Sequence, residues 1–539
     1  MERLYFADNL QVLRENLHEA SVDLIYLDPP FNSKRHYNLL FKGRKGGECD
    51  AQITAFEDTW RWGEPAEREY REILGQANTE IAEIMRALRS FLGENDLMAY
   101  LVMMANRLIE MHRVLKPTGS LYLHCDPTAS HYLKLVLDGV FGKENFRTEI
   151  SWKRSSAHND GKQGRRQCGN VRDVVLFYTK SDSWTWNCLY TPYDQAYIET
   201  FYRHVEPASG RRYQLSDLTA AKPGGDTLYP WKGVRPYKGR YWAYSKAKME
   251  EFESTGRLIY TKSGMPRYKR YLDEMPGVPL QNDWNDIQPA NGKESLGYQT
   301  QKPLALLERI IQASSNEGDV VLDPFCGCGT AVHAAHKLKR RWIGIDITHL
   351  AISLIERRLK GAFPGIRFQV HGTPKDMQGA QALAARDKYQ FQWWACSLLN
   401  AQPYEKKGAD GGVDGLIFFQ DDRDMAKKIV VSVKGGEHVN VAMIRDLKGV
   451  IERDRAAIGV FLTLARPSQP MRKEAAAAGF YSSPAFNAPY PKLQILTVEG
   501  VLNGTERVRC PDVSGGRLTF KKAAREAHPP VQQTLLLGS

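Results

Sequence analysis

The stretch from Val320 to Asp346 constrains the fold of this chain more than any other part of its sequence. It begins with an apolar run typical of a buried strand and continues into a turn that contains Gly327 and Gly329. A helix-like stretch follows from Ala331 to Lys339, and a second apolar run, Trp342–Asp346, ends in a carboxylate. This order predicts a strand, a glycine turn, a helix and a second strand, which is the repeating unit of an α/β sheet.

The same unit has the features of a nucleoside site of the Rossmann type. Glycines in the turn let the backbone approach a ligand closely, and an acidic residue at the next strand end, Asp346, can bind ribose hydroxyls. The turn lacks the spacing G-x-G-x-x-G, which disfavours a dinucleotide pyrophosphate. A glycine turn alone is a weak indication, so a second signal is needed.

The second signal is Asp28-Pro29-Pro30-Phe31, near the N-terminus. The apolar run Val22–Leu27 predicts a buried strand, so these four residues follow a strand end. The two prolines fix φ and remove two N–H donors, which leaves backbone carbonyls without partners. Together with the Asp28 carboxylate they form a rigid set of acceptors beside an aromatic ring, suited to the exocyclic amine of a nucleobase. Taken alone, an ordinary Asp-Pro-Pro turn before a core phenylalanine is the alternative.

The two segments together resemble the amino-group DNA methyltransferases that use S-adenosyl-L-methionine, in the permuted order called the beta class. The catalytic motif of that family is matched by Asp28–Phe31, and its cofactor motif, D-P-F-x-G-x-G-T, is matched by Asp323–Thr330. Thr300–Pro303 resembles the motif that helps to hold the methionine end of the cofactor. Asp8-Asn9 resembles the acidic turn near the cofactor adenine. The resemblance extends from Met1 to Leu359.

The resemblance implies a set of site residues. The catalytic residues would be Asp28, Pro29, Pro30 and Phe31. The residues that bind S-adenosyl-L-methionine would be Asp8, Thr300, Gln301, Lys302, Pro303, Asp323, Phe325, Gly327, Gly329, Thr330 and Asp346.

The chemistry that these residues would perform follows from the properties of the amine. The nitrogen is a poor nucleophile because its lone pair is delocalised into the ring, and Asp28 with the Pro29 carbonyl can accept both amine hydrogens as the nitrogen attacks. Phe31 would stack on the base, which must be flipped out of the duplex to reach the pocket. Within the family, Asp before the two prolines favours N6 of adenine, and N4 of cytosine is the alternative.

The composition agrees with an enzyme that acts on nucleic acid. The chain has 539 residues, too many for one compact core, and its net charge of +12 favours a polyanionic partner such as double-stranded DNA. We expect a cytoplasmic protein without a membrane partner, because the sequence has no spanning apolar run or signal peptide and its eight cysteines suggest free thiols. A zinc site at Cys326 and Cys328 is disfavoured because no second pair accompanies them. A homodimer is one option within the family.

Between Thr191 and about residue 290 the chain becomes rich in aromatic and basic residues, in the place where the family has its target-recognition region. Such interleaving suits phosphate contact combined with base stacking. For any single residue, a solvated surface charge is the alternative. The DNA-contacting residues that we expect are Lys153, Arg154, Arg165, Arg166, Trp231, Lys232 and Arg235.

After Gly372 the alternation of helices and strands resembles the Mrr-like branch of the PD-(D/E)xK nucleases. Asp414 and Lys434 match the family's Asp and Lys, but Ser432 stands where an acidic residue or Gln is usual. The resemblance implies a Mg²⁺-dependent endonuclease with Asp414 as metal ligand, and with Asp410 or Gln392 as a candidate for the missing oxygen. A domain that binds DNA without cutting is the alternative.

We therefore expect an α/β protein with a Rossmann-like methyltransferase domain, an inserted target-recognition region and a C-terminal α/β domain of the restriction-endonuclease type. The predicted methyltransferase domain is 1–372, with a catalytic half at 1–190, the recognition region at about 191–290 and a cofactor half at 291–372. The nuclease-like domain is 373–510, and 511–539 is a mobile tail. Another insertion is expected from Glu48 to Glu94, and within it one amphipathic helix from Tyr70 to Leu92. The fused activities would serve restriction–modification.

Overall fold

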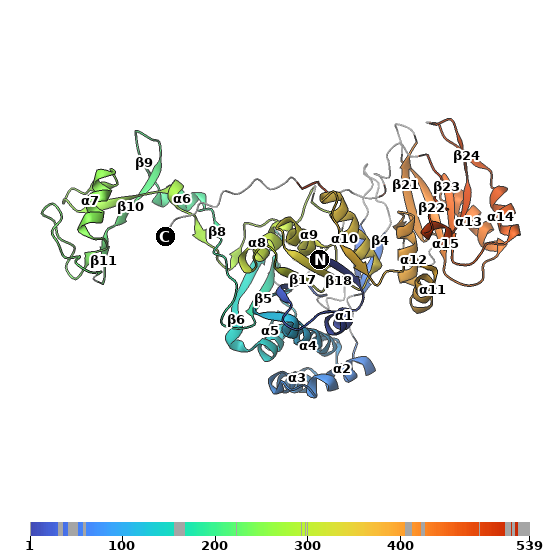
Figure 1. Ribbon diagram of the computed structural model, residues 1–539, viewed down its shortest axis with the longest axis horizontal. Helices are drawn as coiled ribbons and strands as arrows, with labels where there is room; N and C mark the ends of the chain where they lie inside the picture. Colours follow the sequence, from blue (N-terminus) through green and yellow to red (C-terminus); the bar gives the residue numbers. More distant parts are fainter. Residues whose placement is uncertain are drawn as a thin grey trace. The chain divides into compact units, whose positions relative to one another are not determined.

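The computed structural model describes most of the chain, and its residues form two compact units (Figure 1). The first unit is Met1–Asn187 with Asn282–Ser539, and the second is Cys188–Gln281. The described residues are 2–30, 36–40, 52–57, 61–155, 166, 168–222, 224–292, 294–296, 298, 300–404, 412–421, 426–484, 486–511, 519 and 523–526. In the hairpin β3 (His36–Leu40) and β4 (Gln52–Glu57) only the backbone is described.

A nine-stranded mixed sheet in the order β16-β6-β7-β5-β2-β17-β18-β1-β19 forms the centre of the first unit. β7 runs antiparallel to β5 and β6, and the other neighbouring pairs are parallel. This arrangement confirms the expected α/β class. The strands are β1 (Arg3–Phe6), β2 (Val22–Leu27), β5 (Leu115–Cys125), β6 (Phe146–Lys153), β7 (Arg172–Thr179), β16 (Asp283–Trp284), β17 (Val320–Asp323), β18 (Arg341–Asp346) and β19 (Gln369–His371).

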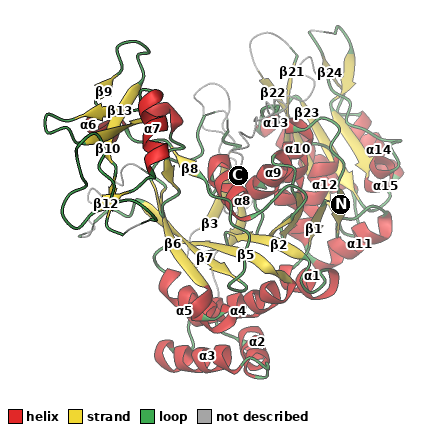
Figure 2. Cartoon of the chain, turned by 60° about the vertical axis from the view of Figure 1, so that its left-hand side comes forward, coloured by secondary structure: helices red, strands yellow, loops and turns green. Residues whose placement is uncertain are grey.

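Helices cover both faces of this sheet (Figure 2). One face carries α1 (Asn9–Asn16), α4 (Asp96–Val114) and α5 (Ser130–Phe141), and a short 3₁₀ turn, Lys143–Asn145, follows α5. The other face carries α8 (Leu304–Ser314), α9 (Thr330–Lys337) and α10 (His349–Ala362). Because parallel strands are buried on both faces, β2 and β17 read as nearly continuous apolar runs, which is why their sequences predicted them.

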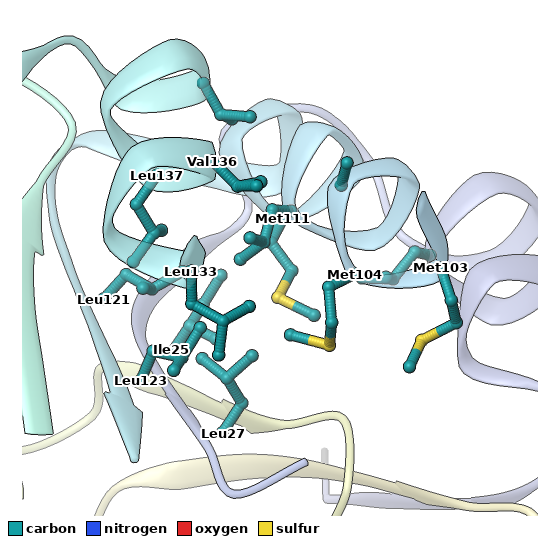
Figure 3. Close-up of a cluster of buried hydrophobic side chains, with 14 of the residues drawn as sticks. Ile25, Leu27, Met103, Met104, Met111, Leu121, Leu123, Leu133, Val136 and Leu137 are labelled. Carbon is teal, nitrogen blue, oxygen red and sulfur yellow. The ribbon is translucent and has the colours of Figure 1, made fainter. Parts of the chain in front are cut away.

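The main hydrophobic core lies between the sheet and helices α4 and α5 (Figure 3). Ile25 and Leu27 of β2 point toward this core together with Leu121 and Leu123 of β5. Since side chains alternate along a strand, the residues between them point to the opposite face, toward α8. The helices contribute Met103, Met104, Met111, Leu133, Val136 and Leu137.

The single helix expected from Tyr70 to Leu92 is wrong. The structure has two helices, α2 (Glu64–Leu74) and α3 (Thr79–Leu92), separated by a short turn. Gly75 ends the first, and Asn78 starts the second by accepting hydrogen bonds from the backbone N–H groups of Glu80 and Ile81. A cap residue of this kind starts a new helix instead of continuing the previous one. The apolar periodicity runs through both helices, and for this reason it suggested a single helix.

The second unit is built around a small antiparallel sheet in the order β13-β14-β10-β9. Its two ends are held together, because β8 pairs with β15 through Thr191 with Val278 and Tyr190 with Pro279. The elements are β8 (Tyr190–Thr191), α6 (Gln195–Phe201), β9 (His204–Val205), β10 (Arg212–Asp217), β11 (Thr219–Ala220), β12 (Tyr241–Trp242), α7 (Lys246–Ser254), β13 (Leu258–Tyr260), β14 (Pro266–Tyr271), a 3₁₀ turn at Leu272–Glu274 and β15 (Val278–Pro279).

The C-terminal part of the first unit has a five-stranded sheet in the order β20-β21-β22-β23-β26. The alternation of helices and strands that we expected after Gly372 is present. The elements are α11 (Met377–Arg386), α12 (Lys388–Leu398), β20 (Gln402–Pro403), β21 (Gly415–Gln420), β22 (Ala426–Lys434), α13 (Val441–Arg453), β23 (Ile458–Thr463), α14 (Gln469–Ala476), β24 (Phe480–Ser482), β25 (Pro489–Pro491), β26 (Leu493–Thr497) and α15 (Val498–Leu502).

Part of the tail that we expected to be mobile has defined contacts. The Thr519 hydroxyl donates to the Phe418 carbonyl at 3.0 Å and accepts from the Phe418 N–H at 3.1 Å. The Glu526 carboxylate lies 2.9 Å from His333 Nε2 on α9. Within the part of the chain that is described, no helix is both long and apolar enough to cross a membrane.

Candidate functional site

Four aspartates gather at one edge of the central sheet because neighbouring parallel strands end there. Asp28 follows β2, Asp323 ends β17, Asp346 ends β18, and Asp8 comes two residues after β1. The registers align these ends, since Leu322 pairs with Ile25, Asp323 with Gly344, and Phe6 with Asp346. All four aspartates line one pocket. The carboxyl ends of parallel strands are the usual place for a ligand crevice in an α/β sheet.

The glycine turn between β17 and α9 is held by two of these carboxylates. Gly327 and Gly329 have φ values of +49° and +73°, in the left-handed region that glycine adopts without strain. Asp346 Oδ2 accepts a hydrogen bond from the Gly327 N–H at 2.9 Å, and Asp323 Oδ1 accepts one from the Phe325 N–H at 3.1 Å. The turn is therefore fixed from the strand ends on both of its sides.

Asp346 also fixes the start of the next helix. Its Oδ1 accepts hydrogen bonds from the Thr348 N–H at 2.9 Å and from the Thr348 hydroxyl at 2.8 Å. Burial raises the pKa of Asp346 and raises that of Asp323 well above its usual range. Each carboxylate oxygen has two lone pairs, so these bonds leave acceptor capacity for a hydroxyl in the pocket.

Asp28 forms an ion pair that its sequence motif does not indicate. Lys302 Nζ lies 2.5 Å from Asp28 Oδ2, and both side chains are mostly buried. Pro29, Pro30 and Thr300 line the same pocket, whereas Phe31 lies outside the described residues. The resemblance assigned Lys302 to the methionine end of the cofactor, and it also lies beside Asp28, the carboxylate that the sequence predicts to be catalytic.

The other residues of the Thr300–Pro303 motif support the local backbone. Gln301 accepts a hydrogen bond from the Leu296 N–H at 2.8 Å and donates one to the Glu294 carbonyl at 2.9 Å. Pro303 is the N-cap residue of α8. Neither Gln301 nor Pro303 is among the residues that line the pocket.

Arg107 of α4 is a site residue that the sequence analysis missed. Its Nε donates to Asn9 Oδ1 at 2.6 Å and its Nη2 donates to Asp8 Oδ2 at 2.9 Å. Asn9 Nδ2 in turn donates to the Pro324 carbonyl at 2.9 Å, so Arg107 connects the acidic turn to the cofactor motif. The signal that could have revealed it is a single charge within the apolar stretch 97–108.

Arg358 of α10 is a second missed residue. Its buried guanidinium donates from Nη1 to the Cys328 carbonyl at 3.1 Å and to the Thr330 hydroxyl at 3.0 Å. Burial lowers the pKa of Arg358. A buried cation of this kind is retained only when it has partners, so Arg358 stabilises the backbone of the glycine turn from behind the pocket.

The C-terminal domain brings the three predicted nuclease residues together around one carboxylate. Asp414 Oδ2 accepts from the Val433 N–H at 2.6 Å and lies 3.4 Å from the Ser432 hydroxyl and 4.0 Å from Lys434 Nζ. Asp414 Oδ1 accepts from Gln392 Nε2 at 2.9 Å. Both oxygens of the carboxylate therefore receive hydrogen bonds from the protein.

This arrangement does not fit a catalytic magnesium ion. Mg²⁺ in nucleases is held by carboxylate oxygens and water in an octahedral arrangement. Among the residues that the structure describes, no group of three or more His, Cys, Asp or Glu side chains could hold a metal ion. Of the two candidates for the additional oxygen, Asp410 lies outside the described residues, and Gln392 donates a hydrogen bond from Nε2 to Asp414.

The residues predicted to contact DNA have different environments. Lys153 ends β6, Arg154 lies 3.2 Å from Asp173, and Arg166 and Arg235 are exposed; Arg165 lies outside the described residues. Lys232 forms an ion pair with Glu253. Trp231 requires a correction, because it is 4% exposed and packs in the hydrophobic core of the second unit. The basic residues around Trp231 suggested that its ring stacks on a base. The ring instead fills the small hydrophobic core of the second unit.

Comparison with known proteins identifies relatives of both parts. A family model for N6/N4 methyltransferases, described as DNA methylase, matches residues 22–357 of the 539. Residues 389–502 match a model described as NACHT-associated inactive restriction endonuclease 1. The second match agrees with a restriction-endonuclease-like domain at the C-terminus.

Similar proteins come from several bacteria. The type II methyltransferase M.EcaI of Enterobacter cloacae is 33% identical over 265 residues, which are 48% of this chain and 57% of that protein. The Mod subunit of the type III restriction-modification enzyme StyLTI of Salmonella typhimurium is 28% identical over 347 residues, 61% of this chain and 49% of that protein. The chain thus spans about half the length of these curated relatives.

A solved structure of a DNA modification methylase from Thermus thermophilus, complexed with S-adenosyl-L-methionine, is 18% identical and covers 69% of this chain and 99% of that chain, with a TM-score of 0.34. The family model, by contrast, covers more than half of the present chain and includes both Asp28 and the glycine turn. The chain therefore belongs to the N6/N4 DNA methylase family.

Proposed function

We propose that this chain is a site-specific DNA methyltransferase that moves a methyl group from S-adenosyl-L-methionine to the exocyclic N6 amine of an adenine flipped out of duplex DNA. The observation that carries the proposal is the shared pocket of Asp28 and the glycine turn at Gly327–Gly329. A methyl acceptor and a methyl donor must meet within about 3–3.5 Å. Two segments far apart in the sequence would bring them together, because both end at the same edge of the sheet.

The pocket suits the cofactor because its polar groups match a nucleoside. Asp346 retains acceptor capacity for ribose hydroxyls, and the turn at Gly327 presents backbone without side chains. Asp8, fixed by Arg107, would face the adenine end. When bound, S-adenosyl-L-methionine supplies an electrophilic methyl group on sulfur. Thr300, Lys302 and Thr330 line the remaining wall.

The residues of this chain would act on the amine. Asp28 accepts one amine hydrogen and the Pro29 carbonyl accepts the other, which directs the nitrogen lone pair toward the methyl group. As the N–C bond forms, the bond between the methyl group and sulfur would break and leave a neutral thioether. The nitrogen would then release one proton, which the Asp28 carboxylate would accept. Lys302, as the counter-ion of Asp28, would keep the carboxylate oriented before the base enters.

The base that is modified can be read directly from the product. We expect nucleosides digested from DNA of cells that express the chain to contain N6-methyladenine, because Asp rather than Ser precedes the two prolines. Mass spectrometry separates this product from N4-methylcytosine, and sequencing of the modified DNA identifies the recognition site. N4-methylcytosine in place of N6-methyladenine would replace the adenine assignment; unmodified DNA would contradict both.

For the C-terminal domain we propose a restriction-endonuclease-like module that no longer cuts DNA. This proposal is supported by the surroundings of Asp414: Ser432 stands where an acidic residue or Gln is usual, and no group of three or more His, Cys, Asp or Glu side chains among the described residues could hold a metal ion. It replaces our sequence-based expectation of a Mg²⁺-dependent endonuclease. DNA binding by the module within a restriction–modification system remains part of the proposal.

We expect purified protein with Mg²⁺ or Mn²⁺ to leave unmethylated plasmid intact, as judged by gel electrophoresis. Asp414→Asn should instead lower the stability of the domain by about 1–3 kcal/mol, because a buried acceptor for two donors is weakened. Asp446→Asn, a change at an exposed position of α13, serves as the control with an unchanged melting temperature. Metal-dependent nicking that Asp414→Asn abolishes would restore the nuclease assignment.

A further inference from the structure

Four polar side chains form a row across the central sheet, from the pocket to the end of β6. Tyr26 Oη of β2 lies 3.1 Å from His124 Nδ1 of β5, and His124 Nε2 lies 3.1 Å from Asp173 Oδ2 of β7. Asp173 Oδ1 and Arg154 Nε, directly after β6, lie 3.2 Å apart and form an ion pair, although their geometry is not that of a hydrogen bond. The strands β2, β5, β7 and β6 are consecutive neighbours in the sheet, so the polar row of Tyr26, His124, Asp173 and Arg154 crosses it strand by strand.

The polar row is buried on the face of the sheet opposite the main core. Leu27 and Leu123 point toward α4 and α5 (Figure 3), so Tyr26 and His124 point toward the other face. Tyr26 is 2% exposed, His124 0% and Asp173 3%. Burying three polar groups costs folding free energy unless they satisfy one another, and apolar residues would serve a sheet interior better. A role beyond packing would explain their presence.

The two ends of the polar row lie at functionally different places. Tyr26 lines the pocket and comes two residues before Asp28. Arg154 is only partly buried, with 32% of its side chain exposed, and it belongs to the stretch expected to face DNA. The Asp173 carboxylate has a lowered pKa: burial alone would raise it, but the hydrogen bond and charge of His124 and the charges of Lys302 and Arg154 outweigh that effect.

We propose that Tyr26, His124 and Asp173 are positioning residues that couple Arg154, where DNA is engaged, to the placement of the target base at Asp28. Asp173 orients the Arg154 guanidinium through their ion pair. His124 contacts both Asp173 and Tyr26, so a shift of Asp173 would also shift Tyr26 and the end of β2. The inference rests on the proposed function, since it assigns these residues a part in methyl transfer. None of them touches the reacting atoms.

A double-mutant cycle tests the coupling. Tyr26→Phe and Asp173→Asn each remove one link of the polar row while preserving side-chain shape. We expect each to lower kcat for duplex DNA about tenfold, and the double variant to lose about tenfold rather than a hundredfold, because either change already breaks the row. The rates are measured at the site identified by sequencing of modified DNA.

Tyr122→Phe is the matched control. Tyr122 is the register partner of Tyr26 on the neighbouring strand, it is equally buried, and its hydroxyl lies 2.7 Å from the Ser314 hydroxyl, away from Arg154. We expect kcat to be unchanged in Tyr122→Phe. Its combination with Asp173→Asn should be additive, because the two residues share no partner.

Two further measurements separate positioning from general loss of structure. The affinity for S-adenosyl-L-methionine should be unchanged in Tyr26→Phe and Asp173→Asn. Their kcat defects should shrink on DNA with a mismatch at the target base, where extrusion is easier. Additive effects of Tyr26→Phe and Asp173→Asn, or equal defects on matched and mismatched DNA, would overturn the coupling. Absence of methyl transfer by the wild-type protein would instead refute the proposed function itself.

Discussion

Asp28→Ala is expected to abolish methyl transfer, with a loss of at least about a thousandfold in kcat, while S-adenosyl-L-methionine still binds. The carboxylate is the only charged acceptor in the Asp28–Phe31 motif, and the alanine variant leaves the Pro29 carbonyl to hold the amine alone. Binding of the cofactor should persist because Asp28 is not among the residues expected to bind it. The substitution therefore separates catalysis from binding.

The effect is measured with tritiated cofactor under single-turnover conditions, and cofactor binding is measured by calorimetry. Asp23→Ala is the matched control: Asp23 lies on the same strand and also pairs with a lysine, Lys116 at 2.8 Å, but it is not among the residues that line the pocket. We expect Asp23→Ala to lower stability and to retain methyl transfer at a temperature where it is folded. Activity in Asp28→Ala above about one tenth of wild type would remove Asp28 from the mechanism.

Gly329→Ala is expected to give the second large effect, a loss of at least about 30-fold in affinity for S-adenosyl-L-methionine. Gly329 has a φ of +73°, and a Cβ atom there would lie 2.7 Å from Ile355 Cγ1 of α10. The left-handed backbone costs an alanine about 1–2 kcal/mol and the overpacking about 1–3 kcal/mol. The turn can relieve both only by moving, which displaces Gly327 from its bond to Asp346.

Gly318→Ala is the control for backbone strain without a steric clash. Gly318 has a φ of +86°, but a Cβ atom there would meet none of the described atoms within 4 Å. It should cost backbone strain of similar size and leave cofactor affinity unchanged. Calorimetric titration of both variants decides the matter: if they lose affinity equally, close packing of the glycine turn against α10 has no part in cofactor binding.

Much of the fold could be predicted because its strongest signals are local. The runs Val22–Leu27 and Val320–Leu322 are apolar, short and followed by proline or glycine, so strand ends could be placed with the catalytic and cofactor motifs directly after them. The convergence of Asp28, Asp323 and Asp346 then follows from parallel strand ends meeting at one edge.

The rest depends on contacts between distant residues, which no local pattern encodes. Arg107 and Arg358 reach the site from helices whose periodicity indicates only packing, and the partner of Lys302 lies 274 residues away in the sequence. Trp231 shows the converse difficulty, because composition cannot distinguish an aromatic residue that fills a small core from one displayed for stacking.

The pairing of β8 with β15 has a consequence for the predicted target-recognition region. Tyr190–Thr191 and Val278–Pro279 close the second unit with a two-stranded stem, so that its chain leaves and returns at one place. A segment closed in this way can be exchanged as a cassette, because a replacement joined at the stem leaves the loops of the surrounding domain unchanged in length. We expect chimeras joined at this stem to fold. Substitutions within the cassette should alter the DNA sequence that is preferred and leave the methyl-transfer reaction unchanged.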